Sequence, residues 1–338
     1  MAGQQLDRDS PSSARCVPIH NSSLLSKEHP RGEGSIPGER CSEERIRAIT
    51  KTKPHLNSFC PLNERWIDAL LEETAHLPSA TLLSIGCNKG EDLIYWMHSW
   101  SRNDKFWVPK YRTCEQEEFP TYVRRKCGQA RQRRFLQAGM AERSVRGVCV
   151  EPMPNNFRLL QTCMGKLGFL GEVNLVNVAV SSSIGTERFP HGQVGEETLG
   201  LEVHPVDVPT VAMNVTTLDS LVRQQNISSI EFLSIDTEGN DMRAVLGGIR
   251  ALGAQMVRYM EFEYHYVGRW RRSDLQDLID LLDQMNYDCF WALNTGGLSR
   301  LTGCWHDSYY REKDWSNVAC INRNQRVTHR KMQRLAGF

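Results

Sequence analysis

The stretch that decides the fold is Ile230-Glu-Phe-Leu-Ser-Ile-Asp-Thr-Glu-Gly-Asn-Asp-Met242. Five of the six residues before Asp236 are typical of a buried strand, with Glu231 as the exception. Asp236, Glu238 and Gly239 follow at the end of this strand, and a helix is expected directly after them. Acidic groups at the carboxyl end of a strand lie where an open α/β sheet binds ligands. The alternative is a turn with a helix-capping acid, and this stretch alone favours neither.

The rest of the chain repeats this order of strand, turn and helix. We expect further strands near 81–86, 147–150, 173–180 and 256–264, and a closing hairpin-like pair at 287–293 and 318–321. The segments between most of these strands carry apolar residues at helical spacing, whereas residues 182–215 are predicted to be irregular or to form short strands. Strands that alternate with amphipathic helices predict an α/β fold with a mostly parallel, doubly wound sheet.

Composition divides the 338 residues into three parts. Residues 1–55 are rich in Ser, Pro, Gly and charge, which predicts disorder. Residues 56–322 hold the alternating pattern and are predicted to form the main domain, with a basic insertion at about 101–146. Residues 323–338 are predicted to be a solvated basic tail.

The formal net charge of +1 gives no overall attraction to nucleic acid. The eleven cysteines show no CxxC, so we expect reduced, buried thiols and no metal site. No apolar run approaches the ~20 residues of a membrane span, and the first residues lack a signal-peptide core, so a cytoplasmic location is expected. On this basis the sequons that begin at Asn21, Asn214 and Asn226 are interpreted as chance matches.

A glycine-containing loop, Ser84-Ile-Gly-Cys-Asn-Lys-Gly90, connects the first strand of this domain to a helix. Glycines let the backbone approach a ligand, and the start of the helix offers free N–H groups. The alternative is a tight turn without a ligand.

The second motif is Glu151-Pro-Met-Pro-Asn-Asn-Phe157. An acid at the end of the second strand can accept two hydrogen bonds from a ribose diol. However, 61 positions separate Gly90 from Glu151, so an insertion has to be assumed. From spacing alone, a helix-capping acid is the favoured interpretation.

Two further strands carry polar candidates. Asn177-Val-Ala-Val-Ser181 reads as a plain buried strand from its composition. In Arg258-Tyr-Met-Glu-Phe-Glu-Tyr-His265, period-two alternation places Glu261 and Glu263 on one side. Because acids on a core strand are costly unless they are paired or terminal, at least one of them is a site candidate.

Taken together and in this order, the motifs resemble the FkbM-type family of S-adenosylmethionine-dependent methyltransferases. The matching motifs are SIGCNKG (84–90), EPMPNNF (151–157), NVAVS (177–181), TLDSL (217–221), FLSIDTEGND (232–241) and EFE (261–263). The resemblance implies a Rossmann-like sheet of seven strands, the class I methyltransferase fold, with helices on both faces. It covers about residues 81 to 265.

The resemblance also implies roles for individual residues, with S-adenosyl-L-methionine as the cofactor. Cofactor-binding positions would be Ser84, Gly86, Asn88, Gly90, Glu151, Asn177, Ala179 and Asp236, with Glu151 on the ribose hydroxyls. Glu238 and Glu263 would lie on the substrate side. The family commonly has Asp where this chain has Ser84, which puts one polar contact to the cofactor in doubt.

A hydroxyl acceptor must lose its proton as it attacks the methyl group, which a nearby carboxylate or His can accept. Asp236 is our first candidate for this catalytic base, followed by Glu261 and His265. We expect O-methylation of a carbohydrate-like or polyhydroxylated small molecule or glycan.

Two alternatives remain open from the sequence. Residues 121–146 hold eight Lys/Arg against one acid, which could serve a nucleic-acid-associated methyltransferase, although the chain has no Pro-Pro word of the kind found in enzymes that methylate base amines. Nucleic acid is therefore not the expected partner. A catalytically silent scaffold that keeps the cofactor fold is the other alternative, and Ser84 is the residue that supports it.

Overall fold

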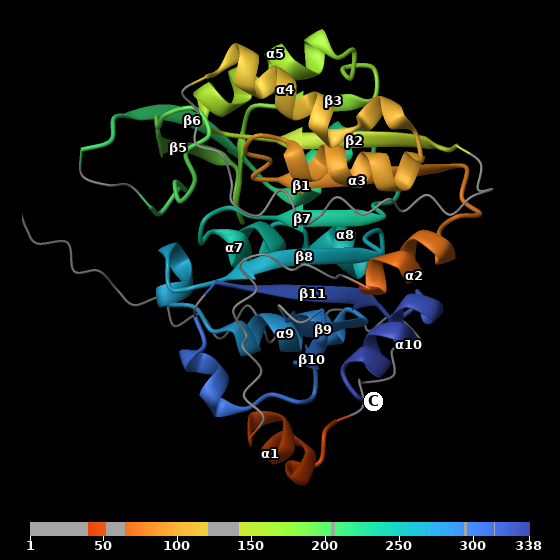
Figure 1. Cartoon of the computed structure of the whole chain (residues 1–338). Helices are drawn as coiled ribbons and strands as arrows, with labels where there is room; N and C mark the ends of the chain where they lie inside the picture. The colour runs from red at the N-terminus through yellow and green to blue at the C-terminus, as the bar shows by residue number, and fades with distance from the viewer. Residues whose placement is uncertain (1–39, 52–64, 121–141, 204–206, 294–295, 314) are drawn as a thin grey trace, which may run out of the picture. The chain divides into compact units, whose positions relative to one another are not determined.

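The computed structural model describes residues 40–51, 65–120, 142–203, 207–293, 296–313 and 315–338, which all lie in the unit Ile36–Phe338 (Figure 1). The strands are β1 (Ser79–Ile85), β2 (Ser144–Val150), β3 (Val173–Val176), β4 (Ala179–Val180), β5 (Gly185–Pro190), β6 (Thr210–Thr216), β7 (Phe232–Ile235), β8 (Tyr259–Tyr264), β9 (Tyr287–Ala292), β10 (Leu298–Arg300) and β11 (Ser316–Asn322). The helices are α1 (Glu43–Lys51), α2 (Arg65–Glu73), α3 (Glu91–Ser101), η1 (Asp104–Phe106), α4 (Val108–Glu118), α5 (Pro154–Lys166), α6 (Leu218–Gln224), α7 (Asp241–Leu246), α8 (Ile249–Gly253), η2 (Gly268–Arg271), α9 (Leu275–Gln284), η3 (Asp307–Arg311) and α10 (Arg326–Leu335).

The described strands form an 8-stranded sheet in the order β10-β9-β11-β8-β7-β1-β2-β3. Strands β3, β2, β1, β7 and β8 are parallel, and β11 lies antiparallel between β8 and β9. The predicted Rossmann-like sheet and its closing antiparallel pair are confirmed. The eighth strand is β10, a three-residue edge strand that extends the expected seven.

Helices cover both faces of this sheet, as predicted (Figure 1). On one face, α6, α7, α8 and α9 pack on residues such as Leu83, Leu233 and Met260. On the other face, α2, α3 and α10 pack on residues such as Leu82 and Phe232. Because both faces are covered, the parallel strands read as apolar runs rather than as alternating patterns. None of the helices in the described ranges is both long and apolar enough to cross a bilayer.

The predicted single strand at 173–180 is wrong, because the segment divides between two sheets. Residues of β3 pair with β2 in the large sheet, whereas β4 pairs with β6. The 3-stranded sheet β4-β6-β5 therefore occupies residues that we expected to be irregular or short-stranded. Its inner face packs Met153, Phe189 and Met213 together, which places this small sheet beside the carboxyl end of β2.

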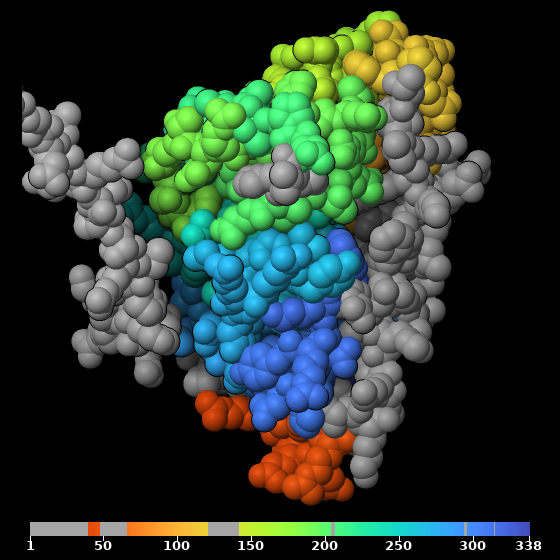
Figure 2. All heavy atoms as spheres, turned by 90° about the vertical axis from the view of Figure 1, so that its left-hand side faces the viewer, coloured from red at the N-terminus to blue at the C-terminus, as the bar shows by residue number. Residues whose placement is uncertain are grey.

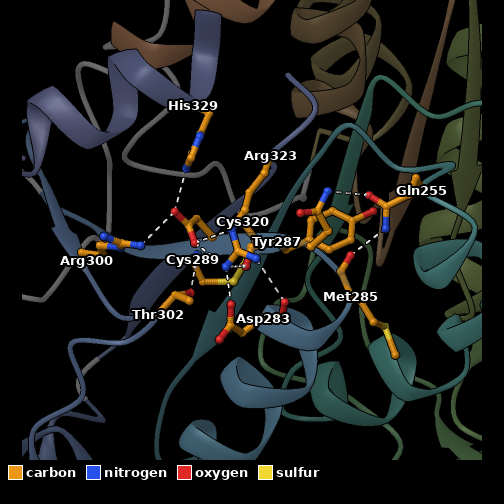
Figure 3. Close-up of polar contacts among 12 residues, drawn as sticks. Gln255, Asp283, Met285, Tyr287, Cys289, Arg300, Thr302, Cys320, Arg323 and His329 are labelled. Atoms are coloured by element: carbon orange, nitrogen blue, oxygen red, sulfur yellow. Dashed lines mark hydrogen bonds and ion pairs between the residues drawn. A yellow bond between two sulfur atoms is a disulfide. The ribbon is translucent and has the colours of Figure 1, made fainter. Parts of the chain in front are cut away.

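The predicted basic tail at 323–338 is not simply solvated, because it contains α10. Thr328 and Met332 on this helix are buried, and Arg323 and His329 contact the buried Asp288 (Figure 3). The disorder predicted for residues 1–55 fails at α1, while residues 1–39 lie outside the described ranges.

The interpretation of the cysteines as reduced thiols is wrong. All eight cysteines in the described ranges form disulfides: Cys41–Cys304, Cys87–Cys149, Cys114–Cys163 and Cys289–Cys320. The partners are 31 to 263 positions apart in sequence, so no short spacing could reveal them. Cys114 on α4 is joined to α5, which shows that part of the predicted insertion at 101–146 is firmly built into the domain. Residues 121–141 of that insertion lie outside the described ranges.

Candidate functional site

A pocket lies at the carboxyl ends of β1, β2 and β7, where an open α/β sheet binds its ligands. Its lining comes from the loops after these strands, from β4 and from the segment 191–203. Figure 2 shows this side of the molecule, where the green segment that contains 191–203 lies next to the light-blue residues that follow β8. Of the predicted cofactor residues, Gly86, Asn88, Glu151, Ala179 and Asp236 line the pocket.

Glu151 is buried at the end of β2, and its carboxylate faces few compensating groups. One oxygen accepts a hydrogen bond from the Asn88 N–H at 2.7 Å, and the other accepts one from the Met153 N–H at 2.8 Å. Burial raises the pKa of Glu151 to about 8, and the nearby Asp236 adds to this effect, whereas these two hydrogen bonds and Lys89 act in the opposite direction. A buried carboxylate held in this way is suited to a ligand that brings its own hydrogen-bond donors.

The backbone of the glycine loop 84–90 lies very close to the backbone of the turn after β7, which carries Asp236. Gly86 has φ +79°, and a Cβ atom there would lie 1.6 Å from the carbonyl oxygen of Asp236. Only glycine fits this position, because any side chain would overlap the Asp236 backbone. The close approach holds the two loops together at one end of the pocket.

Asp241 organises the turn that carries Asp236, and sequence reasoning missed this role. Its carboxylate accepts hydrogen bonds from the Thr237 N–H and the Gly239 N–H, both at 3.1 Å. Burial raises the pKa of Asp241 to about 7, and Asp236 contributes to the rise. The sequence could have indicated this role, because Asp241 ends the turn motif DTEGND, where a side-chain oxygen can accept hydrogen bonds from the preceding backbone N–H groups.

The preceding residue, Asn240, was also missed. Its side-chain amide donates to the Val180 carbonyl at 2.7 Å, which joins the turn to β4. The hydroxyl oxygen of Thr237 is buried beside it and has no hydrogen-bond partner among the described residues. Thr237 lines the pocket, so this buried hydroxyl lies near any molecule that binds there.

The segment 191–203 covers the pocket, although its sequence predicted only irregular structure or short strands. Lys89 of the glycine loop forms an ion pair with Glu197 at 2.7 Å. Asn156 of the second motif accepts a hydrogen bond from the Gly195 N–H at 2.7 Å. Glu238, in the turn after β7, accepts a hydrogen bond from the Thr198 N–H at 2.9 Å. Three motifs that are distant in sequence therefore hold the same covering segment.

The substrate-side candidates Glu238 and Glu263 lie together with His265, the third candidate base, and of these three Glu238 lines the pocket. Glu238, Glu263 and His265 place side-chain oxygen and nitrogen atoms within 4.8 Å of one another. The Val267 N–H donates to His265 Nδ1 at 3.1 Å, so the hydrogen of a neutral ring is on Nε2. Burial lowers the pKa of His265 to about 4, which keeps the ring neutral at pH 7. His265 is thus better suited to donate a hydrogen bond through Nε2 than to act as a base.

The remaining predicted residues do not line the pocket. Glu261 is buried on the face of α2, where it accepts a hydrogen bond from the Tyr259 hydroxyl, which itself accepts one from Trp66 Nε1 at 2.8 Å. The side-chain amide of Asn177 donates to the Glu151 carbonyl at 2.8 Å and so supports the loop after β2. Ser84 is buried within β1, and Gly90 packs closely against α5.

The strand order and the pocket at the strand ends define a Rossmann-like cofactor-binding domain of the class I methyltransferase type. Residues 126–289 match the profile described as methyltransferase FkbM domain, which confirms the predicted resemblance to this family. The match begins after the glycine loop and ends in β9. A comparison with curated proteins gave no match.

Two solved structures show weak similarity. One is methyltransferase FkbM from Methylobacillus flagellatus KT, with 13% identity, a TM-score of 0.39, and coverage of 73% of this chain and 47% of that chain. The other is a protein of the NADB-Rossmann superfamily from Streptococcus agalactiae, with 11% identity, a TM-score of 0.29, and coverage of 79% and 80%. This chain therefore spans about half the length of the first protein.

Proposed function

We propose that this methyltransferase transfers the methyl group of S-adenosyl-L-methionine to a hydroxyl oxygen of a carbohydrate-like or polyhydroxylated acceptor. The observation that carries the cofactor assignment is Glu151, a buried carboxylate at the end of β2 with a raised pKa and no partnering cation within the pocket lining. Two ribose hydroxyls would supply the donors that this carboxylate lacks. The unpartnered hydroxyl of Thr237 is consistent with a polar ligand in the same pocket.

S-adenosyl-L-methionine, when bound, supplies a methyl group that its sulfonium already activates. The protein then has to hold the acceptor in line and to accept its proton. Asp236 lines the pocket at the end of β7, next to the covering segment, and is the proposed base. Lys89 and Glu238 hold that segment in place along one side of the pocket.

His265 is fully buried behind Glu238, and its Nε2 has no hydrogen-bond partner among the described residues. A neutral Nε2–H donates to a hydroxyl oxygen and not to a protonated amine, so an acceptor that reaches this group would be a hydroxyl. Glu263 lies beside it, with 3.8 Å between its oxygen and His265 Nε2, and can accept a hydrogen bond from an acceptor hydroxyl. A polyhydroxylated molecule satisfies both groups at once.

The proposal is tested by methyl transfer from labelled S-adenosyl-L-methionine across a panel of sugars, glycans, small alcohols, amines and RNA. We expect label on oxygen, and a fall in turnover of roughly 100-fold or more in Asp236→Asn with cofactor binding retained, as for loss of a general base. Glu187→Gln, a change of an exposed residue on β5, is the matched control. Label that is found only on amines or on RNA would contradict O-methylation.

The scaffold alternative is separated by calorimetry with S-adenosyl-L-methionine and with NAD. Binding of the first alone supports a methyltransferase, whereas binding of neither supports a silent scaffold. The nucleic-acid alternative depends on the basic stretch 121–146, and residues 121–141 of that stretch lie outside the described ranges.

A further inference from the structure

We propose that Asn226 carries an N-linked glycan. Asn226, Ile227 and Ser228 form the acceptor pattern N-x-S, and both Asn226 and Ser228 are exposed. The side-chain amide of Asn226 takes part in none of the hydrogen bonds found among the described residues, so its nitrogen is accessible. The proposal is independent of the methyl acceptor.

The disulfides supply the second observation, because they report on the compartment in which the chain folds. All eight cysteines in the described ranges are paired, and Cys41–Cys304 joins residues 263 positions apart. Disulfides of this kind form in the oxidising secretory route and are rare in the cytosol. N-linked glycans are a feature of the same route. The disulfides therefore argue against the cytoplasmic location expected from the sequence, and against the interpretation of this sequon as a chance match.

The local backbone offers a competing, purely structural explanation for Asn226. The residue has φ +51° just after α6, where its N–H donates to the Arg223 carbonyl at 3.1 Å. The Ile227 N–H donates to the Val222 carbonyl at 3.0 Å, which completes a Schellman motif. Asn is common at this left-handed position, so the cap accounts for Asn226. It does not account for the exposed hydroxyl residue at Ser228.

The position of Asn226 is compatible with a bulky glycan and an active enzyme. The neighbouring Gln225 accepts hydrogen bonds from Arg146 near the start of β2 at 3.3 Å and from Asn174 near the start of β3 at 2.9 Å. Asn226 therefore lies at the amino ends of the parallel strands, whereas the pocket lies at their carboxyl ends. A glycan at this turn would extend into solvent on the side away from the pocket.

Asn214 is a weaker candidate. It is exposed in the middle of β6, but Thr216 of its sequon is buried at the end of that strand. The turn after α6 presents both required residues at the surface.

The modification forms a bond between the Asn226 amide nitrogen and C1 of an oligosaccharide. The donor is a lipid-pyrophosphate-linked oligosaccharide, whose C1–oxygen bond breaks as the lipid pyrophosphate leaves with the electron pair. The transferring enzyme takes up the proton that the amide nitrogen loses. The reaction needs no oxidant or reductant.

The deciding experiment uses the chain purified from the cells that naturally make it. Amide-cleaving glycosidase in water labelled with heavy oxygen converts a glycosylated Asn into labelled Asp, which peptide mass spectrometry locates. We expect labelled Asp at position 226. Recovery of only unmodified Asn226 would overturn the proposal and leave the helix cap as its role.

A variant set in a eukaryotic secretory host tests the same site. Ser228→Ala removes the sequon and leaves the helix cap intact, Asn226→Gly removes it with a residue that suits φ +51°, and Ser228→Thr keeps it. We expect the first two to lose one glycan on a gel and the third to keep it, with methyl transfer unchanged in all three. Wild-type migration of Ser228→Ala would count against the site.

Discussion

Asp288 and Glu151 are both buried carboxylates, yet their surroundings act on them in opposite ways. Burial alone would raise the pKa of Asp288, but a hydrogen bond from His329 and the charges of Arg300 and Arg323 lower it to about 2. Arg300 of β10, His329 of α10 and Arg323 just after β11 all contact Asp288, and Figure 3 shows these three side chains approaching one another. At Glu151, backbone N–H groups and the more distant Lys89 do not outweigh burial, and the pKa rises to about 8.

The difference separates a structural carboxylate from a ligand-binding one. Asp288 already has its cations, and they anchor β10 and α10 to the sheet. Glu151 lies in a pocket and has to obtain its compensation from a bound molecule. A strongly shifted pKa marks both sites, so the direction of the shift is the more informative quantity.

The largest expected effect is on stability at Asp288. Asp288→Asn leaves Arg300 and Arg323 without their buried counter-charge, which costs about 3–5 kcal/mol for a buried pair that loses one partner. Urea unfolding of the cofactor-free protein measures this loss.

Glu151→Gln is the matched control for that measurement. At about pH 5 the buried Glu151 carboxyl is protonated in the folded protein, so Gln replaces a neutral acid and the free energy of unfolding should change by less than about 1 kcal/mol. Equal losses in the two variants would show that the two carboxylates play the same part in the fold.

The second effect is on cofactor affinity. Here the substitution at Glu151 should have the larger effect, whereas for stability the larger effect is at Asp288. Glu151→Gln removes the charged acceptor for the ribose hydroxyls, at about 1.5–3 kcal/mol for hydrogen bonds to a charged group. Calorimetry should show an increase of roughly 10- to 100-fold in the Kd for S-adenosyl-L-methionine. Glu187→Gln is the control and should bind S-adenosyl-L-methionine with the wild-type Kd. A wild-type Kd for Glu151→Gln as well would contradict the assignment of Glu151 to the ribose hydroxyls.

The sequence predicted the parts of this comparison that depend on local pattern. The strand before Asp236, the acid at 151 and the glycine at 86 were identified because each lies at the end of an apolar run. It could not predict the Asp288 cluster, because Arg300, Arg323 and His329 come together only through the pairing of β9 with its neighbours.

Other features escaped prediction for the same physical reason. The covering role of 191–203 depends on long-range contacts such as Lys89 with Glu197, which leave no periodic signal. Disulfide partners are likewise set by the fold. Glu261 was predicted as a site residue from strand alternation, but alternation gives only the face, and this face is covered by α2.

The third effect is the dependence of stability on pH, which should have opposite signs at the two sites. The folded pKa of Glu151, about 8, exceeds its usual 4.5, so its contribution is complete below about pH 4.5 and is lost as the pH rises toward 8. The folded pKa of Asp288, about 2, is below its usual 3.8, so its contribution is present above 3.8 and is lost as the pH falls toward 2.

Unfolding free energies of the cofactor-free wild type, Glu151→Gln and Asp288→Asn across this range measure both contributions. The difference in unfolding free energy between the wild type and Asp288→Asn should decrease only as the pH falls below about 3.8 toward 2. The wild type should weaken relative to Glu151→Gln as the pH rises from about 5 to 8. Parallel curves in both ranges would contradict the comparison.

The smallest expected effect is the change in cofactor affinity on loss of a disulfide beside one of the two carboxylates. Cys87–Cys149 joins the glycine loop to β2 two residues before Glu151, whereas Cys289–Cys320 joins β9 to β11 next to Asp288. Replacing either pair by Ala should lower stability by about 2–5 kcal/mol, as for native disulfides.

Only the loss of Cys87–Cys149 should also weaken cofactor binding. The loop that positions the Asn88 N–H on Glu151 would then have to be ordered by the ligand, at about 0.5–1.5 kcal/mol, or a few-fold to about tenfold in Kd. Calorimetry at a temperature where both double variants remain folded measures this difference. An equal loss of affinity in the two variants would mean that the disulfides act on the whole domain, and that Cys87–Cys149 has no special part in holding the cofactor loops.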